Sequence, residues 1–486
     1  MSHTLGKPLA AALMAACILS ACRSTDIDLS GRVPVPQSFG QNQAAQGSGN
    51  VARWWQNWHD PVLSALIERA LQQNLDILAA RSRLAEAREQ AALARADLGP
   101  TSGLSASVSA GKSRLDNPIG ADGRNALSRL PQASSLADDK IGGRSQSALA
   151  GVSASWEADI FGRKRSDADA ARYAALGQQE QLYGTQLLVA GDIAGNYFQA
   201  RAAEGRLQTA ARSTAALQKM LRYTEARFAA GHATAYDVEQ ARAALSAMQA
   251  KHSTIEAERA VYVRNIAVLS GQVPQGYVLP DSPADPLANR PAAPSGQTPQ
   301  GMIERRPDIR ANAAQVRAYA ARLASAKADL LPRFTISFMG RDGRIELDGD
   351  SVLKGWSSML SLGIQVPLFT NGRIQANIRA AAARLQTALL RYDQVLLTAL
   401  GEADSAYQMH TALARQTALL QSAERASAKQ AADAQGLFRY GKITLDQALR
   451  AEISAQDARE NLIRSQLAGA QAAVALYKAL GGGWTE

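Results

Sequence analysis

Side chains that could perform catalysis or hold a metal are few and scattered in this sequence. It has two cysteines, Cys17 and Cys22, so the rest of the chain has neither a disulfide framework nor a cysteine-based metal site. None of the five histidines has the spacing of a metal-binding motif such as His-Glu-x-x-His. The complete phosphate-binding motif Gly-x-x-x-x-Gly-Lys-Ser/Thr and the nucleophile motif Gly-x-Ser-x-Gly are also absent from the sequence. We therefore expect no catalytic residue and no metal site.

The thiol of Cys22 is the group with the best defined chemistry. Lys7 precedes an apolar run at residues 8–19, and the run ends in Leu-Ser-Ala-Cys. These features are typical of a secretory signal peptide, which we place at residues 1–21. The last four residues also resemble the bacterial lipobox, in which the cysteine is lipidated and becomes the first residue of the mature protein. We predict that Cys22 carries diacylglycerol and N-palmitoyl; cleavage without lipidation is the alternative.

The sequence after this cysteine favours an outer-membrane location. Arg23 follows it, whereas lipoproteins kept at the inner membrane commonly have aspartate there. No run of about 18 apolar residues, the length that a membrane-spanning helix needs, occurs after Cys22. If the chain crosses lipid, a closed barrel is the structure that satisfies its backbone hydrogen bonds.

The composition favours helices and argues against a nucleic-acid partner. The chain is 46% hydrophobic but only 5% aromatic, and alanine, the best helix former, is its main apolar residue. The net charge of +10 comes mostly from arginines spread along helical stretches. A nucleic-acid-binding surface would need these charges in a block or stripe.

The prolines divide the chain into two halves. The sequence has 17 prolines, and none of them lies in residues 163–273 or 368–486. Since proline breaks helix interiors, both tracts can form very long helices. Between them, residues 275–301 are rich in proline and small residues, which indicates a linker.

The two halves resemble each other, which indicates an internal duplication. Residues 94–100 recur as residues 326–332, at an offset of 232. The pattern Phe-x-x-Gly-x-x-Thr also occurs twice, at an offset of 210, and it comprises Phe228, Gly231 and Thr234 in the first half and Phe438, Gly441 and Thr444 in the second. The offsets differ because the first half has a longer loop between residues 100 and 162.

Four segments alternate between apolar residues and small polar ones, as strands do. They lie at about residues 101–112, 148–160, 333–341 and 357–368. Two hairpins of a soluble sheet are the alternative, but no other strands are present to build a core with them. Four strands cannot close a membrane barrel, because the smallest known have about eight. Several copies must therefore share one barrel, and this argument leaves two, three or four copies open.

The proline-free tracts are long enough to cross a compartment. From residue 163 to 230 the helical pattern covers a length on the order of 100 Å, and a second such run spans residues 373–438. Uninterrupted helices of this length indicate coiled-coil packing. Gly231 and Gly441 end these runs, and the threonines that follow can cap the next helices. Such hairpin tips are natural docking sites for a partner.

These features together resemble the TolC family, in its branch of outer-membrane lipoproteins that serve RND-type efflux pumps. The resemblance rests on the lipobox, Trp54-Trp55 with Trp58, the segment Glu304–Arg310, the paired tip motifs, and the closing segment Tyr477–Trp484. It implies a mainly α fold with a membrane β-barrel part. Long antiparallel coiled-coil helices would form a periplasmic α-barrel, and four strands per chain would give a 12-stranded barrel in a homotrimer.

The resemblance also implies partners and a gate. The tips would contact a periplasmic adaptor protein and, through it, an inner-membrane RND-type pump. The channel would be a passive conduit for drugs or other small molecules. Family members often carry acidic residues past the second tip, so Asp446 is a candidate for the periplasmic constriction, and Asp237 past the first tip is a second candidate. This sequence departs from the family pattern at Arg450, where an acidic residue would be usual. The alternative to a role in the constriction is that both aspartates are solvated residues near a helix N-terminus, which favours acidic side chains.

The sequence thus predicts five segments. They are the signal peptide at 1–21, a lipid-anchored segment at 22–60, a first repeat at 61–274 with its tip at 231, the linker at 275–301, and a second repeat at 302–486 with its tip at 441. A coiled-coil lipoprotein or adhesin without a pore is an alternative function, but it would leave the four strands without a role. An outlet for type I secretion or heavy-metal efflux remains an alternative, because no residue here identifies the cargo.

Overall fold

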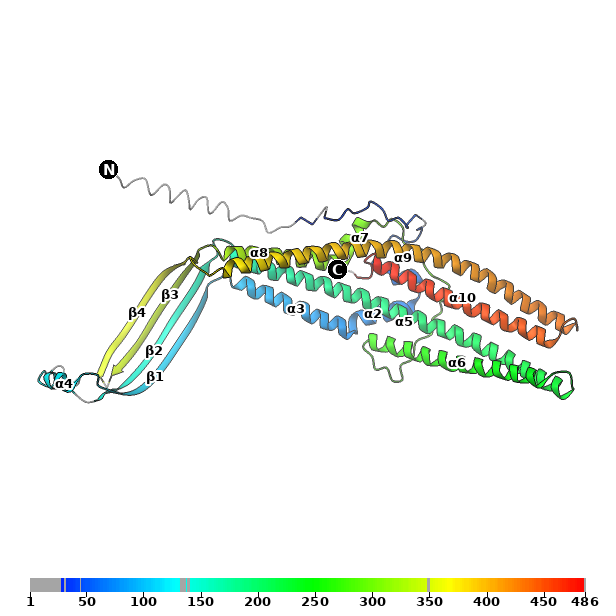
Figure 1. Ribbon diagram of the computed structural model, residues 1–486, viewed down its shortest axis with the longest axis horizontal. Helices are drawn as coiled ribbons and strands as arrows, with labels where there is room; N and C mark the ends of the chain where they lie inside the picture. The colour runs from blue at the N-terminus through cyan, green and yellow to red at the C-terminus, as the bar shows by residue number, and fades with distance from the viewer. Residues whose placement is uncertain are drawn as a thin grey trace. The chain divides into compact units, whose positions relative to one another are not determined.

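The computed structural model describes residues 28–29, 32–43, 45–131, 137, 140–347 and 350–484 (Figure 1). Cys22 and the predicted signal peptide lie outside these residues. The chain forms two compact units, and each unit combines segments from both halves of the sequence. The first unit includes Glu89–Arg172 and Ala318–Leu385; the second includes Ile27–Arg88, Tyr173–Arg317 and Gln386–Glu486.

The helices of the two halves have equal lengths. α5 (Arg163–Ala229) and α9 (Arg373–Arg439) have 67 residues each, and α6 (Ala235–Leu269) and α10 (Leu445–Ala479) have 35 each. α3 (Leu75–Ala96) and α8 (Pro307–Ala328) have 22 residues each. The expected combination of long helices with four strands is confirmed.

The first unit contains one antiparallel sheet with the strand order β1-β2-β3-β4 (Figure 1). Its strands are β1 (Thr101–Asp116), β2 (Lys140–Ala158), β3 (Arg333–Leu347) and β4 (Asp350–Gln365). They extend further toward the hairpin turns than the alternating apolar pattern does. Backbone pairing continues there although charged residues such as Lys112 and Arg344 interrupt the apolar pattern, because a ladder hydrogen bond does not require an apolar side chain. The short helix α4 (Ala121–Leu127) lies in the β1–β2 connection.

The two faces of this sheet differ in chemistry. One face carries large apolar side chains that are mostly exposed, among them Leu104, Val152, Ile336 and Leu362. The other face carries small hydroxyl residues, which pair across strands; Ser337 and Ser361, for example, have their hydroxyl oxygens 2.7 Å apart. An exposed apolar surface of this size indicates that the sheet is covered by another apolar phase.

An aromatic cluster forms the core of the second unit. Trp54 and Trp58 come from the 3₁₀ helix η1 (Trp54–Trp58) and have no exposed surface. Trp54 stacks on Tyr477 of α10, with ring centroids 5.8 Å apart, and Trp58 stacks on Phe198 of α5 at 5.2 Å. The segment before α2 (Pro61–Gln73) is therefore part of the helical body.

The described residues include no helix that is both long enough and apolar enough to span a bilayer. A cluster of at least three histidine, cysteine or acidic residues that could hold a metal ion is likewise absent from the part of the chain that the structure describes.

Candidate functional site at the helix tips

Each long helix ends at a glycine in the left-handed region. Gly231 has a φ of 74°, and its N–H donates to the carbonyl oxygen of Phe228 at 2.9 Å. Gly441 has a φ of 65°, and its N–H donates to the carbonyl oxygen of Phe438 at 2.9 Å. Nothing lies within 4 Å of a Cβ placed on either residue. Backbone conformation, and not lack of space, therefore favours glycine at both tips.

A capping box starts the helix that follows each tip. Oγ1 of Thr234 accepts from the N–H of Asp237 at 3.2 Å, and the Thr234 N–H donates back to the carboxylate at 2.8 Å. Thr444 and Gln447 form the equivalent pair, at 3.3 and 3.0 Å. Reciprocal bonds of this kind satisfy two backbone donors at the start of a helix. The two tips are therefore rigid turns with the same backbone design.

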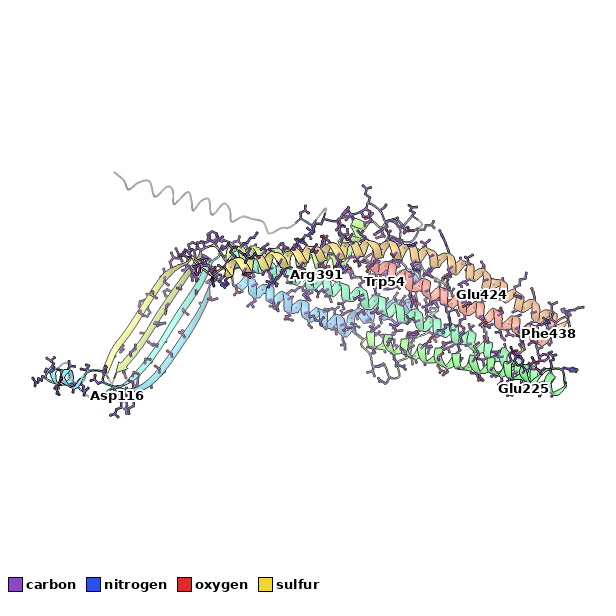
Figure 2. All side chains as sticks on the ribbon, in the orientation of Figure 1. Trp54, Asp116, Glu225, Arg391, Glu424 and Phe438 are labelled. Atoms are coloured by element: carbon purple, nitrogen blue, oxygen red, sulfur yellow. The ribbon has the colours of Figure 1, made fainter. Side chains whose placement is uncertain are left out.

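Exposed aromatic side chains surround both tips, which lie at the same end of the second unit. Figure 2 shows Phe438 and Glu225 at this end of the helices. Tyr236 is 74% exposed and Tyr440 is 82% exposed, while Phe228 is also exposed. Large, rigid side chains held in the open on a rigid turn are the usual anchors of a protein interface.

The two candidate constriction residues have different surroundings. The carboxylate of Asp237 accepts from both the N–H and the hydroxyl of Thr234, each at 2.8 Å. Asp237 is thus a member of the capping box, and these hydrogen bonds lower its pKa. Asp446 instead accepts from Nε of Arg450 at 3.0 Å, one turn further along α10. The second aspartate therefore faces a neutralising cation on its own helix.

Apolar side chains pack the two helix pairs together just behind the tips. This cluster joins α5, α6 and α10 and comprises Ala216, Met220, Ala241 and Leu449, with Leu221, Leu445 and Ile453 packed against it. Alanine at the contacts lets helix backbones approach closely. Further from the tips, a Cβ on Gly205 of α5 would lie 3.2 Å from Ile463 of α10, so this glycine marks a close helix contact.

A buried carboxylate holds α10 against α5 and α6. The side chain of Glu460 is only 6% exposed and forms ion pairs with Lys251, Arg206 at 3.5 Å and Arg464 at 2.7 Å. Burial by itself raises the pKa of Glu460, but the hydrogen bond and charge of Lys251, together with Arg464, lower it overall. This ion cluster, Glu460 with its three cations, connects the two helix pairs.

Two equivalent polar residues close the opposite ends of the shorter helices. Asn74 donates from Nδ2 to the carbonyl oxygen of Leu269, the last residue of α6, at 2.9 Å. Arg306 donates from Nη1 to the carbonyl oxygen of Ala479, the last residue of α10, at 3.0 Å. Both satisfy carbonyl groups that a helix end leaves free.

The N-terminal segment that precedes the aromatic cluster lies along α9. Arg32 makes two hydrogen bonds to the carboxylate of Asp393, at 2.9 and 2.7 Å. The ring of Phe39 lies 5.8 Å from that of Tyr407, between centroids. Gly47 donates to the linker carbonyl of Ala293 at 2.7 Å. Residues 32–51 therefore attach the region after Cys22 to the helical body.

The tips could be identified from the sequence, whereas the ion cluster and the role of the buried Asp60 could not. Its carboxylate caps α2 and accepts from the hydroxyl of Tyr197 at 2.5 Å. Burial and this hydrogen bond raise the pKa of Tyr197 to about 12. An Asp-Pro pair at a helix start is a capping signal, and Glu460 with Arg464 has the spacing of a helical ion pair. The tyrosine, Arg206 and Lys251 come from distant segments, so no local signal reveals them.

Comparison with known proteins identifies the family. The family model described as "Outer membrane efflux protein" matches residues 66–272 and 298–482. The chain is 28% identical over 475 residues to the pyoverdine export outer membrane protein OpmQ of Pseudomonas aeruginosa, covering 97% of this chain and 96% of that protein. It is 26% identical over 493 residues to the toluene efflux pump outer membrane protein TtgC of Pseudomonas putida, covering 99% and 96%.

A solved structure agrees with this assignment. The outer-membrane channel OprN superimposes with a TM-score of 0.79 at 26% identity, covering 94% of this chain and 98% of that one. The TolC-type resemblance noted from the sequence is thereby confirmed. This chain belongs to the outer membrane efflux protein family and is an outer-membrane channel component of a tripartite efflux system.

Proposed function

We propose that three copies of this chain join their sheets into one twelve-stranded barrel, which forms the exit of the efflux system. The proposal is carried by the sheet of the first unit. Within the described residues, β1 and β4 each pair with only one neighbour, so the sheet has two open edges. Backbone N–H and C=O groups at such an edge cannot remain unpaired in lipid.

The chemistry of the two faces fits this arrangement. The exposed apolar face would contact lipid, and the face with small hydroxyl residues would line the water-filled lumen. Pairing of β1 of one copy with β4 of the next closes the ring and removes both edges. The number three is the one that the family resemblance implies; two or four copies would also close the edges.

The helices of the second unit would form a periplasmic tunnel in the same assembly. Large apolar side chains are exposed along their outer surfaces, including Leu188 on α5 and Leu390, Leu397 and Leu419 on α9. Rows of exposed leucines on long helices are the surface that neighbouring helices cover in a coiled coil. The tunnel conducts passively, and its energy comes from the pump.

The helix tips would contact the periplasmic adaptor. The residues assigned to this contact are Phe228, Gly231 and Thr234 at the first tip and Phe438, Gly441 and Thr444 at the second. The glycines and threonines hold the turn, and the aromatic rings with Tyr236 and Tyr440 supply the contact area. Asp446 is assigned to the narrow part of the tunnel entrance, where its ion pair with Arg450 sets the local charge.

A lipid on Cys22 would anchor the chain at the inner surface of the outer membrane. The support is the lipobox sequence and the attachment of residues 32–51 to α9. The partner pump is assigned to the RND type, and the cargo to small organic molecules. The assignment of the cargo draws on relatives named for pyoverdine export and toluene efflux.

Deletion of the gene, followed by complementation, tests this function. We expect sensitivity to drugs, dyes and solvents to rise in the deletion strain and to return to normal with the wild-type gene. The double variant Tyr236→Ala/Tyr440→Ala should reach the outer membrane in the normal amount but should not restore resistance, and it should cross-link less to the adaptor. The control is Val278→Ala, because Val278 is an exposed apolar residue of the linker. This control variant should restore both the normal amount of channel and the resistance. Sensitivity to metal salts alone would contradict the organic cargo.

A further inference from the structure

The apolar face of the sheet does not stay apolar along its whole length. Near the helices, β3 presents Phe334, Ile336 and Phe338 on this face. Side chains alternate between faces along a strand, so Asp342 and Arg344 lie on the same face, closer to the β3–β4 turn. Exposed charge therefore follows directly on an exposed apolar segment.

Two cross-strand pairs on this face bring cations together. Arg344 lies opposite Lys354 on β4, and Lys112 of β1 lies opposite Arg144 of β2. Like charges directly opposite each other in an antiparallel sheet destabilise it. Glu346 forms an ion pair with Arg344, but within the described residues Lys354 and Lys112 form none. Lys354 and Lys112 are therefore the cations of these pairs without an ion pair in the described part of the chain, whereas Arg344 is balanced by Glu346 and has Asp342 beside it on the same face.

The two cation pairs occupy corresponding places on their strands. On β4, Leu360 and Leu362 are followed toward the turn by Trp356, which is 71% exposed, and then by Lys354. On β1, Leu104 and Val108 are followed by Lys112. Strands of a membrane barrel are tilted, so such end points on different strands can share one depth in the membrane. An exposed tryptophan at this point is typical of the membrane interface.

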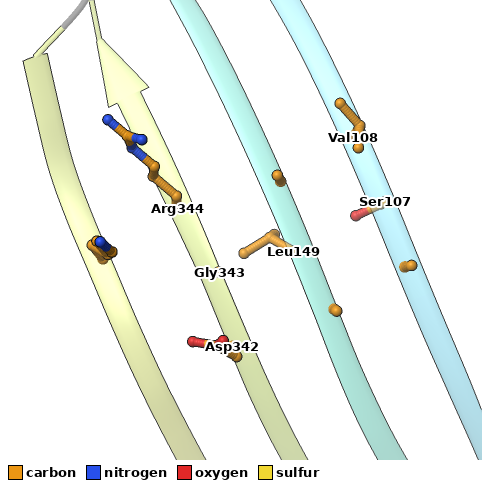
Figure 3. Close-up of a pocket in the computed structure, with 10 residues that line it drawn as sticks. Ser107, Val108, Leu149, Asp342, Gly343 and Arg344 are labelled. Atoms are coloured by element: carbon orange, nitrogen blue, oxygen red, sulfur yellow. The ribbon is translucent and has the colours of Figure 1, made fainter.

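A hollow in the sheet surface lies beside the first cation pair. Its lining includes Ala106, Val108, Ala148 and Ala150, with Asp342, Arg344 and Lys354 at one side. All of these lie on the apolar face. Figure 3 shows the neighbouring strands that carry Arg344, Leu149 and Val108 around the hollow. The remaining lining residues, Ser107, Leu149 and Gly343, lie between the others in their strands. Small apolar side chains beside Arg344 and Lys354, with Asp342 as the one acidic residue of the lining, fit an amphiphile with a negative head.

We propose that this surface binds a phosphate-bearing lipid of the outer leaflet, with the phosphate between Arg344 and Lys354 and an acyl chain over the alanines of the hollow. The opposed cations then share an anion, and the repulsion between them becomes an attraction to the ligand. The pair Lys112 and Arg144 holds a second phosphate at the same depth. These four residues are called the cation rim.

The placement in the outer leaflet rests on the proposed function. The helices follow one end of the sheet, and the β1–β2 and β3–β4 connections close the other end. With the helices in the periplasm, the turn end of the sheet points outward. The cation rim lies between the apolar segment and the turns, where lipid headgroups of the outer leaflet are found.

Native mass spectrometry of the mature channel in neutral detergent tests the proposal, with lipid A as the probe. Diphosphorylated lipid A is titrated against the same lipid after removal of its phosphates, and against inorganic phosphate. We expect the phosphorylated lipid to bind at least tenfold more tightly than the dephosphorylated one. Equal affinity for the two lipids would overturn the proposal. Complete displacement of lipid A by inorganic phosphate at the same concentration as the lipid would also overturn it.

The variant R344S/K354S tests the residues. Each basic residue near an anionic lipid surface contributes roughly a factor of five in binding, so affinity should fall about 25-fold. Arg341→Ser is the matched control, because Arg341 lies on the same strand but on the opposite face. It should bind lipid A as the wild type does. An equal loss in both variants would contradict the placement.

A second readout separates binding from folding. In neutral detergent without lipid A, K354S should melt at the same temperature as the wild type or higher, because it removes a like-charge repulsion. A lower Tm under these conditions would mean that the residue has a structural role, and would overturn the proposal. Conductance in planar bilayers is measured in parallel. A channel that conducts normally without discriminating between the two lipids refutes the lipid site alone and leaves the proposed function standing.

Discussion

The ion cluster around Glu460 gives the sharpest prediction about the helical body. Glu460→Gln keeps the shape of the side chain and removes its charge. Breaking a buried ion pair by removing one partner costs about 3–5 kcal/mol. Lys251 and Arg464 keep contact with water, with side chains 33% and 57% exposed, so solvent screening lowers the expected cost to about 2 kcal/mol.

Hydrogen exchange measured by mass spectrometry in detergent reports this cost locally. About 2 kcal/mol corresponds to roughly a 30-fold increase in the equilibrium constant for the local opening of α10 away from α5 and α6. Amides of α10 near Glu460 should exchange faster by that factor at pH 7. Glu424→Gln is the matched control, since Glu424 lies 3.9 Å from Arg459 in a more exposed pair. The control should change exchange by about twofold or less.

The same cluster predicts a pH dependence with a definite sign. The pKa of Glu460 is lowered in the folded protein relative to the ordinary value of 4.5. Its contribution to stability is therefore fully present above pH 4.5 and is lost as the pH falls through the lowered pKa. The difference in Tm between wild type and Glu460→Gln should be full at pH 7 and shrink below pH 4.5. Exchange in α10 that is unchanged by the variant, or a Tm difference independent of pH, would refute this reasoning.

Three further predictions concern the anchor and the tips. Cys22→Ala should abolish incorporation of labelled palmitate; label that still enters the variant would exclude this residue as the site. Gly441→Ala should cost about 1–2 kcal/mol, because φ is positive there, and should weaken cross-linking to the adaptor, whereas Gly436→Ala in the helix interior should be neutral or stabilising. Asp446→Asn leaves Arg450 unpaired and should shift ion selectivity toward anions in planar bilayers; unchanged selectivity would remove Asp446 from the constriction.

Local patterns in the sequence were sufficient for the main elements of the fold. Proline cannot occupy a helix interior, so two tracts without it marked α5 with α6 and α9 with α10. Strict alternation marked the apolar part of each strand. The repeated Phe-x-x-Gly-x-x-Thr pattern placed Gly231 and Gly441 between helices, because a left-handed turn favours glycine. Each of these signals can be recognised along the chain without knowing which distant segments come into contact.

The sequence did not reveal features that depend on distant segments. Arg206, Lys251 and Glu460 come into contact only when α5, α6 and α10 pack together. Their spacing in the sequence does not predict this contact. The outer parts of the strands were also missed, because the apolar pattern stops before the backbone ladder does. Opposed cations such as Arg344 and Lys354 become visible only when the strand register is known.

The number of chains in the channel tests the central claim most directly. The sheet of one chain has two open edges, so copies must share one barrel. Native mass spectrometry of the detergent-purified mature protein should give a mass of three chains. A folded monomer as the only species, with no ion conductance in planar bilayers, would contradict the account.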